Sequence, residues 1–144
     1  MPMDRSRYPT DWDAISLAVK RRADFRCEWC DVPHGAFIVR DKLDPRRYEI
    51  VSMEADMSVE TAYLDGDKVT RVVLTVHHIG VDKPDGTPGD RHDKMDCRAE
   101  NLVCLCQRCH LLADLDVHIA NAAETRRRKR IAAGQMQMEL GVAR

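Results

Sequence analysis

Two Cys-x-x-Cys pairs constrain this chain more than any other feature of its sequence. Cys27 and Cys30 form the first pair. Cys106 and Cys109 form the second. The two-residue spacer places both thiols of a pair on one tight turn, and two such turns complete the tetrahedral four-sulfur site that Zn2+ prefers. We therefore predict a structural zinc site that closes the long segment between the pairs, at an entropic cost that grows slowly with loop length.

Other interpretations of the cysteines stay open at this stage. The pairs can be chance neighbours in a chain with six cysteines, or one of them can be a redox dithiol. The redox role is the weaker alternative because neither pair lies in a predicted βαβ pattern. Cys104 also competes with Cys106 as a ligand, since it lies only two residues earlier. We favour Cys106 because its spacing to Cys109 repeats the spacing of the first pair.

Length and composition indicate a single domain with a thin core. The chain has 144 residues, of which 33% are charged and only 5% aromatic, so a metal site is a useful addition to the hydrophobic core. No apolar run reaches the length of a membrane span, and the first residues lack the apolar stretch of a signal peptide. We expect a cytoplasmic protein with no membrane contact, in which reduced cysteines bind metal.

Residue patterning predicts helices mixed with short strands. Helical spacing of apolar residues predicts helices at 14–23 and at about 107–133, the second with a break near Asp116. Short strands are expected at 36–39, 48–53, 59–64, 69–76 and 101–105. The turn at Asp65-Gly66 favours a hairpin between the third and fourth of these strands. Prolines and glycines between positions 80 and 89 indicate a loop.

Histidine and asparagine side chains occur at the ends of these predicted elements. His77 and His78 end the fourth strand, and Asn101 begins the returning strand. His110 directly follows Cys109, so that a zinc site would fix it in the first turn of a helix. The order is then strand, loop, strand and helix around one divalent ion. As alternatives, the two adjacent histidines form a solvated turn, and Asn101 only caps a turn.

These motifs resemble the HNH endonuclease family. The matching segments are CEWC at 27–30, VHHI at 76–79, NLVCLC at 101–106 and CQRCH at 106–110. The resemblance covers about residues 12–118 and implies an α+β fold with a small ββα-metal core, also called a His-Me finger, a structural zinc knot and flanking helices. It implies one HNH nuclease domain over 1–144, with its core at about 12–118 and a basic helical tail at about 119–144.

The family resemblance also implies a role for each residue of the motif. His78 aligns with the general base, and a neutral imidazole can take a proton from water at physiological pH. His77 and His110 align with ligands of a catalytic ion, which would be Mg2+, Mn2+, Ni2+ or Zn2+. Asn101 aligns with the residue whose amide orients the loop that carries the base. Because adjacent side chains of a strand point to opposite faces, both histidines reach one site only if the strand end bends, and Gly80 is consistent with a bend.

Several neighbouring polar residues have weaker signals. Asp114 and His118 lie one and two turns after His110 on the predicted helix, where they are further ligands, phosphate contacts or part of a solvated face. His92 and Asp93 lie in the loop and are expected to be exposed to solvent.

Charge is unevenly distributed along a chain whose net charge is only −1. Acidic residues gather in the middle, whereas a basic run near the C-terminus contains Arg126, Arg127, Arg128, Lys129 and Arg130. This run is a candidate phosphate-binding patch, with a solubilising tail as the alternative. Such contacts do not depend on base sequence. No function is assigned to residues 41–64.

From these observations we expect a metal-dependent HNH endonuclease, a phosphodiester hydrolase that cuts or nicks DNA. Its cofactors would be a structural Zn2+ and one catalytic divalent cation. Small proteins of this kind occur in phage and bacterial genomes, so a partner in genome packaging or restriction follows from the resemblance alone. The alternatives are a catalytically inactive, zinc-stabilised module that binds nucleic acid and a zinc-stabilised protein-interaction domain.

Overall fold

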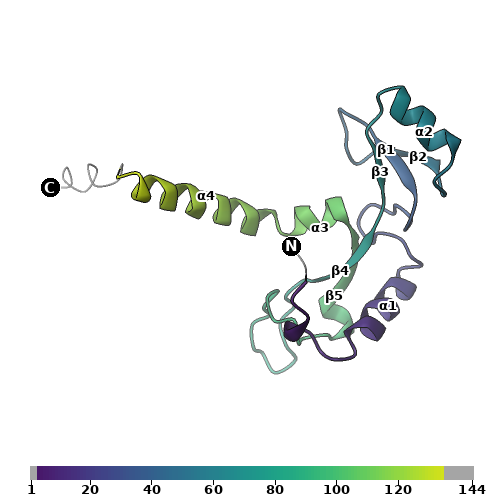
Figure 1. Ribbon diagram of the computed structural model, residues 1–144. Coiled ribbons are helices and arrows are strands. Elements are labelled where there is room, and N and C mark those ends of the chain that lie inside the picture. Colours follow the sequence, from purple (N-terminus) through teal and green to yellow (C-terminus); the bar gives the residue numbers. More distant parts are fainter. Residues whose placement is uncertain (1–2, 135–144) are drawn as a thin grey trace. The chain divides into compact units, whose positions relative to one another are not determined.

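The computed structural model describes residues 3–134 (Figure 1). The chain divides into two compact units, Met1–His110 and Leu111–Arg144, and each is described here by itself. The fold is α+β, as the sequence predicts. It contains two small antiparallel sheets, and helices precede, separate and follow their strands in the chain. Among the described residues, no helix combines the length and apolar character that a membrane span requires.

The first unit contains most of the regular elements. In chain order these are η1 (Arg5–Arg7), α1 (Trp12–Arg22), β1 (Phe37–Arg40), β2 (Tyr48–Ser52), α2 (Met57–Leu64), β3 (Val69–Arg71), β4 (Leu74–His78), η2 (Ala99–Asn101) and β5 (Leu102–Cys106). Two helices follow, α3 (Gln107–Ala113) and α4 (Leu115–Ala132). The helix predicted at 14–23 is therefore confirmed with a start two residues earlier.

Helix α1 packs against β4, the strand that carries His77 and His78, and against its partner β5. Trp12 and Val19, seven residues apart, form the buried face of the helix. Basic residues in its last turn suit the negative end of a helix. The helix stops because Asp24 and Phe25 adopt left-handed backbone angles, with φ of 53° and 52°. This sharp turn leads directly into the first cysteine pair.

The three-stranded sheet has the order β2-β1-β3, with every neighbouring pair antiparallel. The third predicted strand, residues 59–64, is wrong, because these residues form part of helix α2. The apolar pattern of this stretch fits either period, and the N-cap decides between them. The Asp56 carboxylate accepts a hydrogen bond from the Ser58 amide at 2.9 Å, which satisfies one of the first unpaired donors of the helix.

The hairpin predicted across Asp65-Gly66 is also wrong, since that turn joins α2 to β3 and β3 pairs with β1. The predicted strand 69–76 is in fact two strands of different sheets. At the break, the side chain of Gln107 accepts a hydrogen bond from the Val73 amide at 3.1 Å and donates one to the Arg71 carbonyl at 2.8 Å. An amide side chain from α3 thus satisfies the backbone where the chain leaves one sheet for the next.

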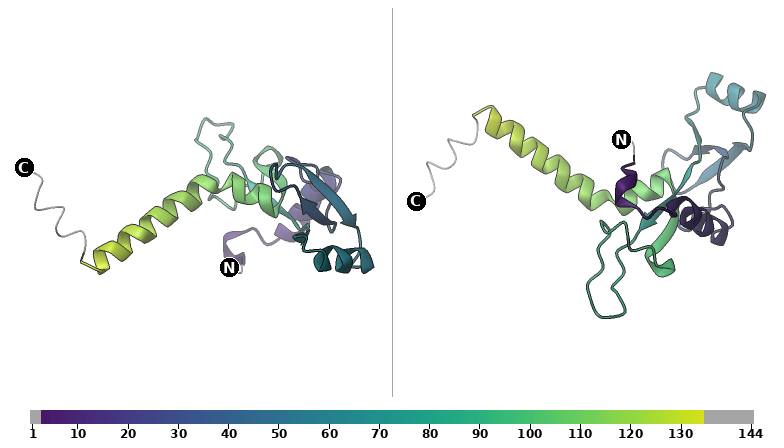
Figure 2. Two further views of the ribbon diagram at one scale, coloured as in Figure 1. Left: turned by 90° about the horizontal axis from the view of Figure 1, so that it is seen from above. Right: turned by 60° about the horizontal axis from the view of Figure 1, so that its bottom comes forward.

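Strands β4 and β5 form the second sheet, an antiparallel pair in which Leu74 lies opposite Cys106 and His78 opposite Leu102. All five residues of β5 are buried. The predicted returning strand is confirmed, one residue later than expected. A long loop, residues 79–98, connects the two strands through η2, and Figure 2 shows it projecting from the end of β4.

The predicted helix 107–133 is confirmed as two helices that divide at Asp114, two residues before the expected break. None of the residues of α4 is buried. Part of the basic tail predicted at 119–144 lies in this helix, and its last ten residues, 135–144, lie outside the described part of the chain.

Candidate metal centres

Four cysteine thiols gather at one end of the β4–β5 pair. The ligand sulfurs of Cys27, Cys30, Cys106 and Cys109 all lie within 4.8 Å of one another, and the sulfurs of Cys30 and Cys106 are 3.6 Å apart. A tetrahedral zinc with bonds of about 2.3 Å requires sulfurs about 3.8 Å apart. All four are free thiols. The cluster can therefore hold a metal ion such as zinc.

The first cysteine turn is built by local backbone hydrogen bonds. The Cys27 amide donates to the Val32 carbonyl at 3.0 Å, and the Asp31 amide donates to the Cys27 carbonyl at 2.8 Å. Asp31 adopts a left-handed conformation with φ of 64°, which closes the turn. Glu28 then attaches this turn to β5, because its backbone amide donates to the Cys104 carbonyl at 2.9 Å and its carboxylate accepts from the Cys104 amide.

Cys104 lies outside the four-cysteine group, although the sequence left it as a competitor of Cys106. Its side chain is fully buried, and burial, reinforced by the negative charge of Glu28, raises the pKa of the Cys104 thiol to about 11. A thiol with such a pKa stays protonated at neutral pH. Cys104 therefore acts as a small apolar residue of the core.

Within the cluster the four thiols do not have equivalent proton affinities. A hydrogen bond from Cys106 lowers the pKa of Cys27 to about 4, and the same bond raises the pKa of Cys106. Burial raises the pKa of Cys109 to about 12. A bound dication would favour the thiolate form of the cysteines, because its charge offsets the cost of burying negative sulfurs.

Arg40 contacts the cysteine cluster, and nothing in the sequence indicated this contact. Its Nη2 lies 3.7 Å from the Cys106 sulfur and 3.9 Å from the Cys30 sulfur. The same guanidinium donates to the Pro45 carbonyl at 3.0 Å and lies over the Tyr48 ring. Arg40 therefore links the β1–β2 hairpin to the sulfur cluster and provides positive charge beside it.

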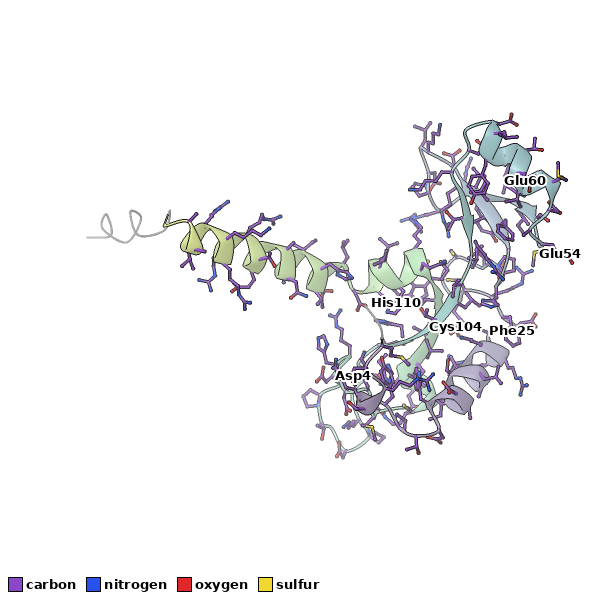
Figure 3. All side chains as sticks on the ribbon, in the orientation of Figure 1. Asp4, Phe25, Glu54, Glu60, Cys104 and His110 are labelled. Carbon is purple, nitrogen blue, oxygen red and sulfur yellow. The ribbon has the colours of Figure 1, made fainter. Side chains whose placement is uncertain are left out.

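Two histidines that are distant in sequence lie together on one side of the β4–β5 pair. His77 on β4 and His110 in α3 have ring centroids 4.8 Å apart and nearly perpendicular planes. Their candidate ligand nitrogens lie within 4.8 Å of each other. Figure 3 labels His110 on α3, one residue after the last cysteine of the cluster. The two residues predicted as ligands of one ion are therefore adjacent.

A threonine two residues before His77 orients His110. The Thr75 hydroxyl donates to the Leu105 carbonyl at 3.3 Å and lies 2.8 Å from His110 Nδ1. The direction of the contact with Nδ1 depends on the tautomer: if the hydroxyl proton goes to the carbonyl, His110 Nδ1 carries a proton and donates it to the hydroxyl. The lone pair of Nε2 is then available for a metal ion, an arrangement common among metal-binding histidines.

His78 has different surroundings from His77. The strand pairing runs without interruption through both residues, so their side chains point to opposite faces, and the backbone bend occurs only at Gly80 with φ of 86°. His78 is 1% exposed and stacks on Trp12 at 5.3 Å between ring centroids, with Tyr8 at 6.0 Å. Burial, followed by the positive charge of Lys94, lowers the pKa of His78, which keeps the imidazole neutral at pH 7.

The amide of Asn101 holds both ends of the loop that follows the histidines. Its Oδ1 accepts hydrogen bonds from the amides of Gly80 and Val81, each at 2.8 Å, and its Nδ2 donates to the Asp96 carbonyl at 2.8 Å. Asn101 is completely buried. At Gly80 a side chain would meet the Arg91 amide nitrogen at 2.8 Å, so the bend accommodates glycine alone.

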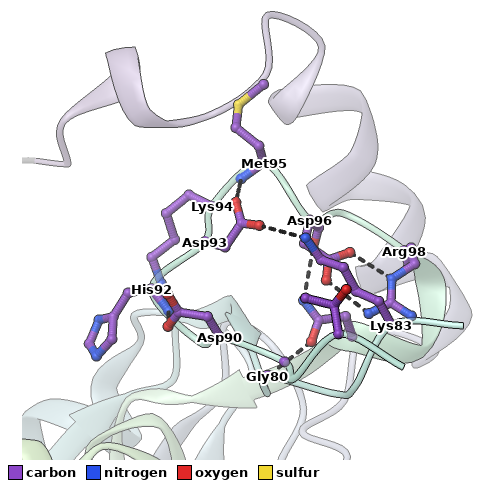
Figure 4. Close-up of polar contacts among 12 residues, drawn as sticks. Gly80, Lys83, Asp90, His92, Asp93, Lys94, Met95, Asp96 and Arg98 are labelled. Carbon is purple, nitrogen blue, oxygen red and sulfur yellow. Dashed lines mark hydrogen bonds and ion pairs between the residues drawn. The ribbon is translucent and has the colours of Figure 1, made fainter. Parts of the chain in front are cut away.

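The rest of the loop is fixed by side chains of its own (Figure 4). Lys83 forms an ion pair with Asp93 at 3.3 Å, and Arg98 forms one with Asp96 at 2.8 Å. His92 is exposed, as predicted, but Asp93 is half-buried in its ion pair, which corrects the expectation that it faces solvent. Asp82 accepts a hydrogen bond from the Gly89 amide. These contacts give the loop a defined conformation despite its glycines and prolines.

The basic run lies on α4, in the second unit, and its side chains are exposed. Glu124 pairs with Arg127 at 2.8 Å and with Arg128 at 2.9 Å, and these hydrogen bonds lower the pKa of Glu124 to about 2. The other members of the run are Arg126, Lys129 and Arg130. One carboxylate thus offsets part of the positive charge of the run and leaves most of it on the surface.

Comparison of the chain with protein-family models, with curated proteins and with solved structures found no match. Two contributors to the centres, Arg40 and Trp12, could not have been identified from sequence, because their partners lie far along the chain. Thr75 could have been, since alternation along a strand places it on the same face as His77.

Proposed function

We propose that this protein is a metal-dependent endonuclease of the HNH type that hydrolyses phosphodiester bonds in DNA. The observation that carries the proposal is the adjacency of His77 and His110, with His110 placed directly after the second cysteine pair. Structural zinc in the cysteine cluster would fix the start of α3, and with it one of the two imidazoles. A second divalent ion between the imidazoles would be the catalytic ion.

The ion at the histidines would stabilise the negative charge that develops on the phosphate during hydrolysis. His110 would present Nε2 to it, held in that tautomer by Thr75. Two histidine ligands leave coordination positions for water and for a phosphate oxygen, as a catalytic site requires.

His78 is the proposed general base. Its side chain lies on the face of β4 opposite to that of His77, so the strand end would have to rearrange for His78 to reach water bound to the ion. Its surroundings suit one requirement of that role. Its lowered pKa keeps it neutral, so that it can accept a proton from water at physiological pH. Asn101 would act as a positioning residue, because it fixes the backbone immediately after the histidines. A second requirement is access for water, which the packing of Tyr8 and Trp12 on the imidazole restricts.

This packing favours one alternative, a zinc-stabilised module that binds nucleic acid without cutting it. In that case His78 is an aromatic core residue, and the exposed basic run on α4 contacts phosphates through charge alone. Both candidates predict DNA binding and a bound zinc. They differ in whether the histidines are needed for cleavage.

A plasmid-nicking assay separates the two candidates. Supercoiled DNA is incubated with Mg2+ or Mn2+ and with wild-type protein, His78→Ala or His92→Ala. The exposed loop residue His92 serves as the matched histidine control. We expect nicking by wild type and by His92→Ala, but not by His78→Ala. Equal nicking by all three, or by none, would contradict the proposed endonuclease. Metal analysis should find one tightly bound zinc and a second ion that exchanges with the buffer.

A further inference from the structure

The β1–β2 hairpin carries a cationic pocket that the proposed mechanism does not use. The pocket has a volume of about 650 Å3 and is lined by side chains from the ends of both strands and from the turn between them. Three of these are arginines, namely Arg40, Arg46 and Arg47, and Tyr48 lies beside them. We name this cavity the hairpin pocket. Most of its lining residues belong to the stretch of sequence, 41–64, to which motifs assigned no function.

Three arginines line the pocket against two carboxylates, and the acids of the turn are hydrogen-bonded mainly to its backbone. Asp41 accepts hydrogen bonds from the amides of Leu43 at 2.7 Å and Asp44 at 2.8 Å, and these bonds lower the pKa of the Asp41 carboxyl. Asp44 accepts from the Arg46 amide at 3.1 Å. Both acids therefore stabilise the turn geometry, and the one ion pair that they form with an arginine of the pocket, within residues 3–134, is the long contact between Asp44 and Arg47 at 3.7 Å.

The arginines of the pocket divide into one that is anchored and two that are free to contact a ligand. Arg40 is held by the Pro45 carbonyl and the cysteine sulfurs. Arg47 lies 3.7 Å from Asp44 with 81% of its side chain exposed, and Arg46 forms no ion pair among residues 3–134. Glu49, at the edge of the pocket, is the one lining carboxylate without a hydrogen bond in that range.

We propose that the hairpin pocket binds the phosphodiester backbone of nucleic acid. Guanidinium groups match phosphate oxygens in pairs of hydrogen bonds, and two exposed guanidiniums next to one that is fixed in place provide a built site for such an anion. The proposal rests on the proposed function, since it gives that function a DNA contact in the same unit as the histidines. Contacts of this kind give affinity and salt dependence and no base preference.

The test is a titration of duplex DNA labelled with a fluorophore, at several salt concentrations and with no divalent cation added, so that cleavage does not interfere. The variant Arg46→Gln/Arg47→Gln removes two exposed side chains and should fold like wild type, which a thermal melt verifies. Each lost phosphate contact removes about 0.9 from the slope of log K against log salt. We therefore expect the slope to fall by about 1.8 and the affinity to fall about tenfold or more at 0.1 M salt.

Two control variants make the expected result specific to the pocket. Arg5→Gln/Lys68→Gln removes the same charge from exposed positions outside the hairpin and should change the affinity by less than about threefold. Glu49→Gln removes the repelling carboxylate and should strengthen binding, a result that loss of folding cannot imitate.

The outcomes also distinguish this inference from the proposed function. Unchanged affinity and salt slope in Arg46→Gln/Arg47→Gln overturn the hairpin pocket even if the wild type nicks plasmid. Absence of DNA binding by the wild type overturns it as well. So does a result in which Arg46→Gln/Arg47→Gln binds polyglutamate more weakly than the wild type does but binds DNA equally well. A binding defect in the variant without any nicking by the wild type supports the pocket and contradicts the endonuclease.

Discussion

The cysteine cluster and the histidine pair lie on the same pair of strands but differ in how completely they enclose an ion. Cys106 ends β5, whereas His77 lies near the end of β4, so the two centres occupy different parts of one antiparallel ladder. The cluster offers four sulfurs, three of them buried, which fill a tetrahedral coordination sphere. The histidine pair offers two nitrogens, so the other coordination positions of a bound ion are left to other ligands.

The position of the histidine pair depends on the cysteine cluster. His110 follows Cys109 directly, so the cysteine cluster positions one of the two imidazoles. The four-sulfur group is completed by Cys27, Cys30, Cys106 and Cys109 and includes neither histidine. We therefore expect damage to the cluster to remove both centres, and damage to the histidines to remove only the open one. Variants of each centre test this asymmetry.

The cysteine cluster is expected to be essential for folding. Cys27→Ala should lose zinc and about 5 kcal/mol or more of unfolding free energy, because metal binding and folding are coupled in small domains. Metal analysis and a circular dichroism melt provide the measurement. The matched control is Cys104→Ala, a buried cysteine outside the cluster, which should keep its zinc and lose about 1–2 kcal/mol. A well-folded Cys27→Ala protein without zinc would falsify the structural role.

The histidine pair should be dispensable for folding and necessary for cleavage. His77→Ala should retain zinc and a cooperative melt but nick plasmid about a thousandfold more slowly, because one ligand of the proposed catalytic ion is lost. Nicking rates in Mg2+ and Mn2+, with His92→Ala as the exposed control, give the measurement. If His77→Ala unfolds or loses zinc like Cys27→Ala, the two centres are not separable and the comparison fails.

Asn101 should affect both stability and cleavage. Asn101→Ala leaves the amides of Gly80 and Val81 without their acceptor in a fully buried position, which should cost about 3 kcal/mol of unfolding free energy. Cleavage should fall more than stability predicts, since the loop after the histidines loses its fixed conformation. Asn121→Ala, on the exposed surface of α4, should change the melt by less than about 0.5 kcal/mol. A similar melt for both variants would contradict this role.

Arg40 should make a smaller contribution to the cysteine cluster. Arg40→Met removes the positive charge and the N–H groups beside Cys30 and Cys106, and zinc affinity should fall by about tenfold, as is usual when a group that contacts metal ligands is lost. Competition with a chromogenic chelator measures this affinity. Arg40→Lys keeps the charge and should recover part of the affinity. Equal affinity in all three proteins would show that the guanidinium does not act on the cluster.

The smallest expected change in unfolding free energy comes from the protonation of His78, and it is visible in the pH dependence of stability. Its pKa in the folded protein is lowered by burial, so the unfolded chain binds a proton on this residue more readily than the folded protein does. Unfolding free energy should therefore decrease as pH falls below about 6.5, the ordinary histidine value. Subtracting the pH profile of His78→Gln isolates this contribution from that of the zinc ligands. A difference that does not change between pH 8 and pH 5 would show that burial does not perturb His78.

Local spacing in the sequence was sufficient to predict the parts of the molecule that depend on near neighbours. The four cysteines, the position of His110 after Cys109 and the extended segment that runs into His77 and His78 all follow from residues a few positions apart. The α+β class follows as well, since helical and alternating patterns are local properties. For the same reason the helix over 14–23 was predicted correctly to within two residues.

Only the tertiary structure decided which segments meet. The stretch 69–76 divides between two sheets because Gln107, more than thirty residues later, satisfies the backbone at the break. Trp12 covers His78, and Arg40 reaches the sulfur of Cys106, through packing between elements distant in the chain. Such long-range contacts depend on how complete elements fit together, and a pattern of neighbouring residues does not encode them separately.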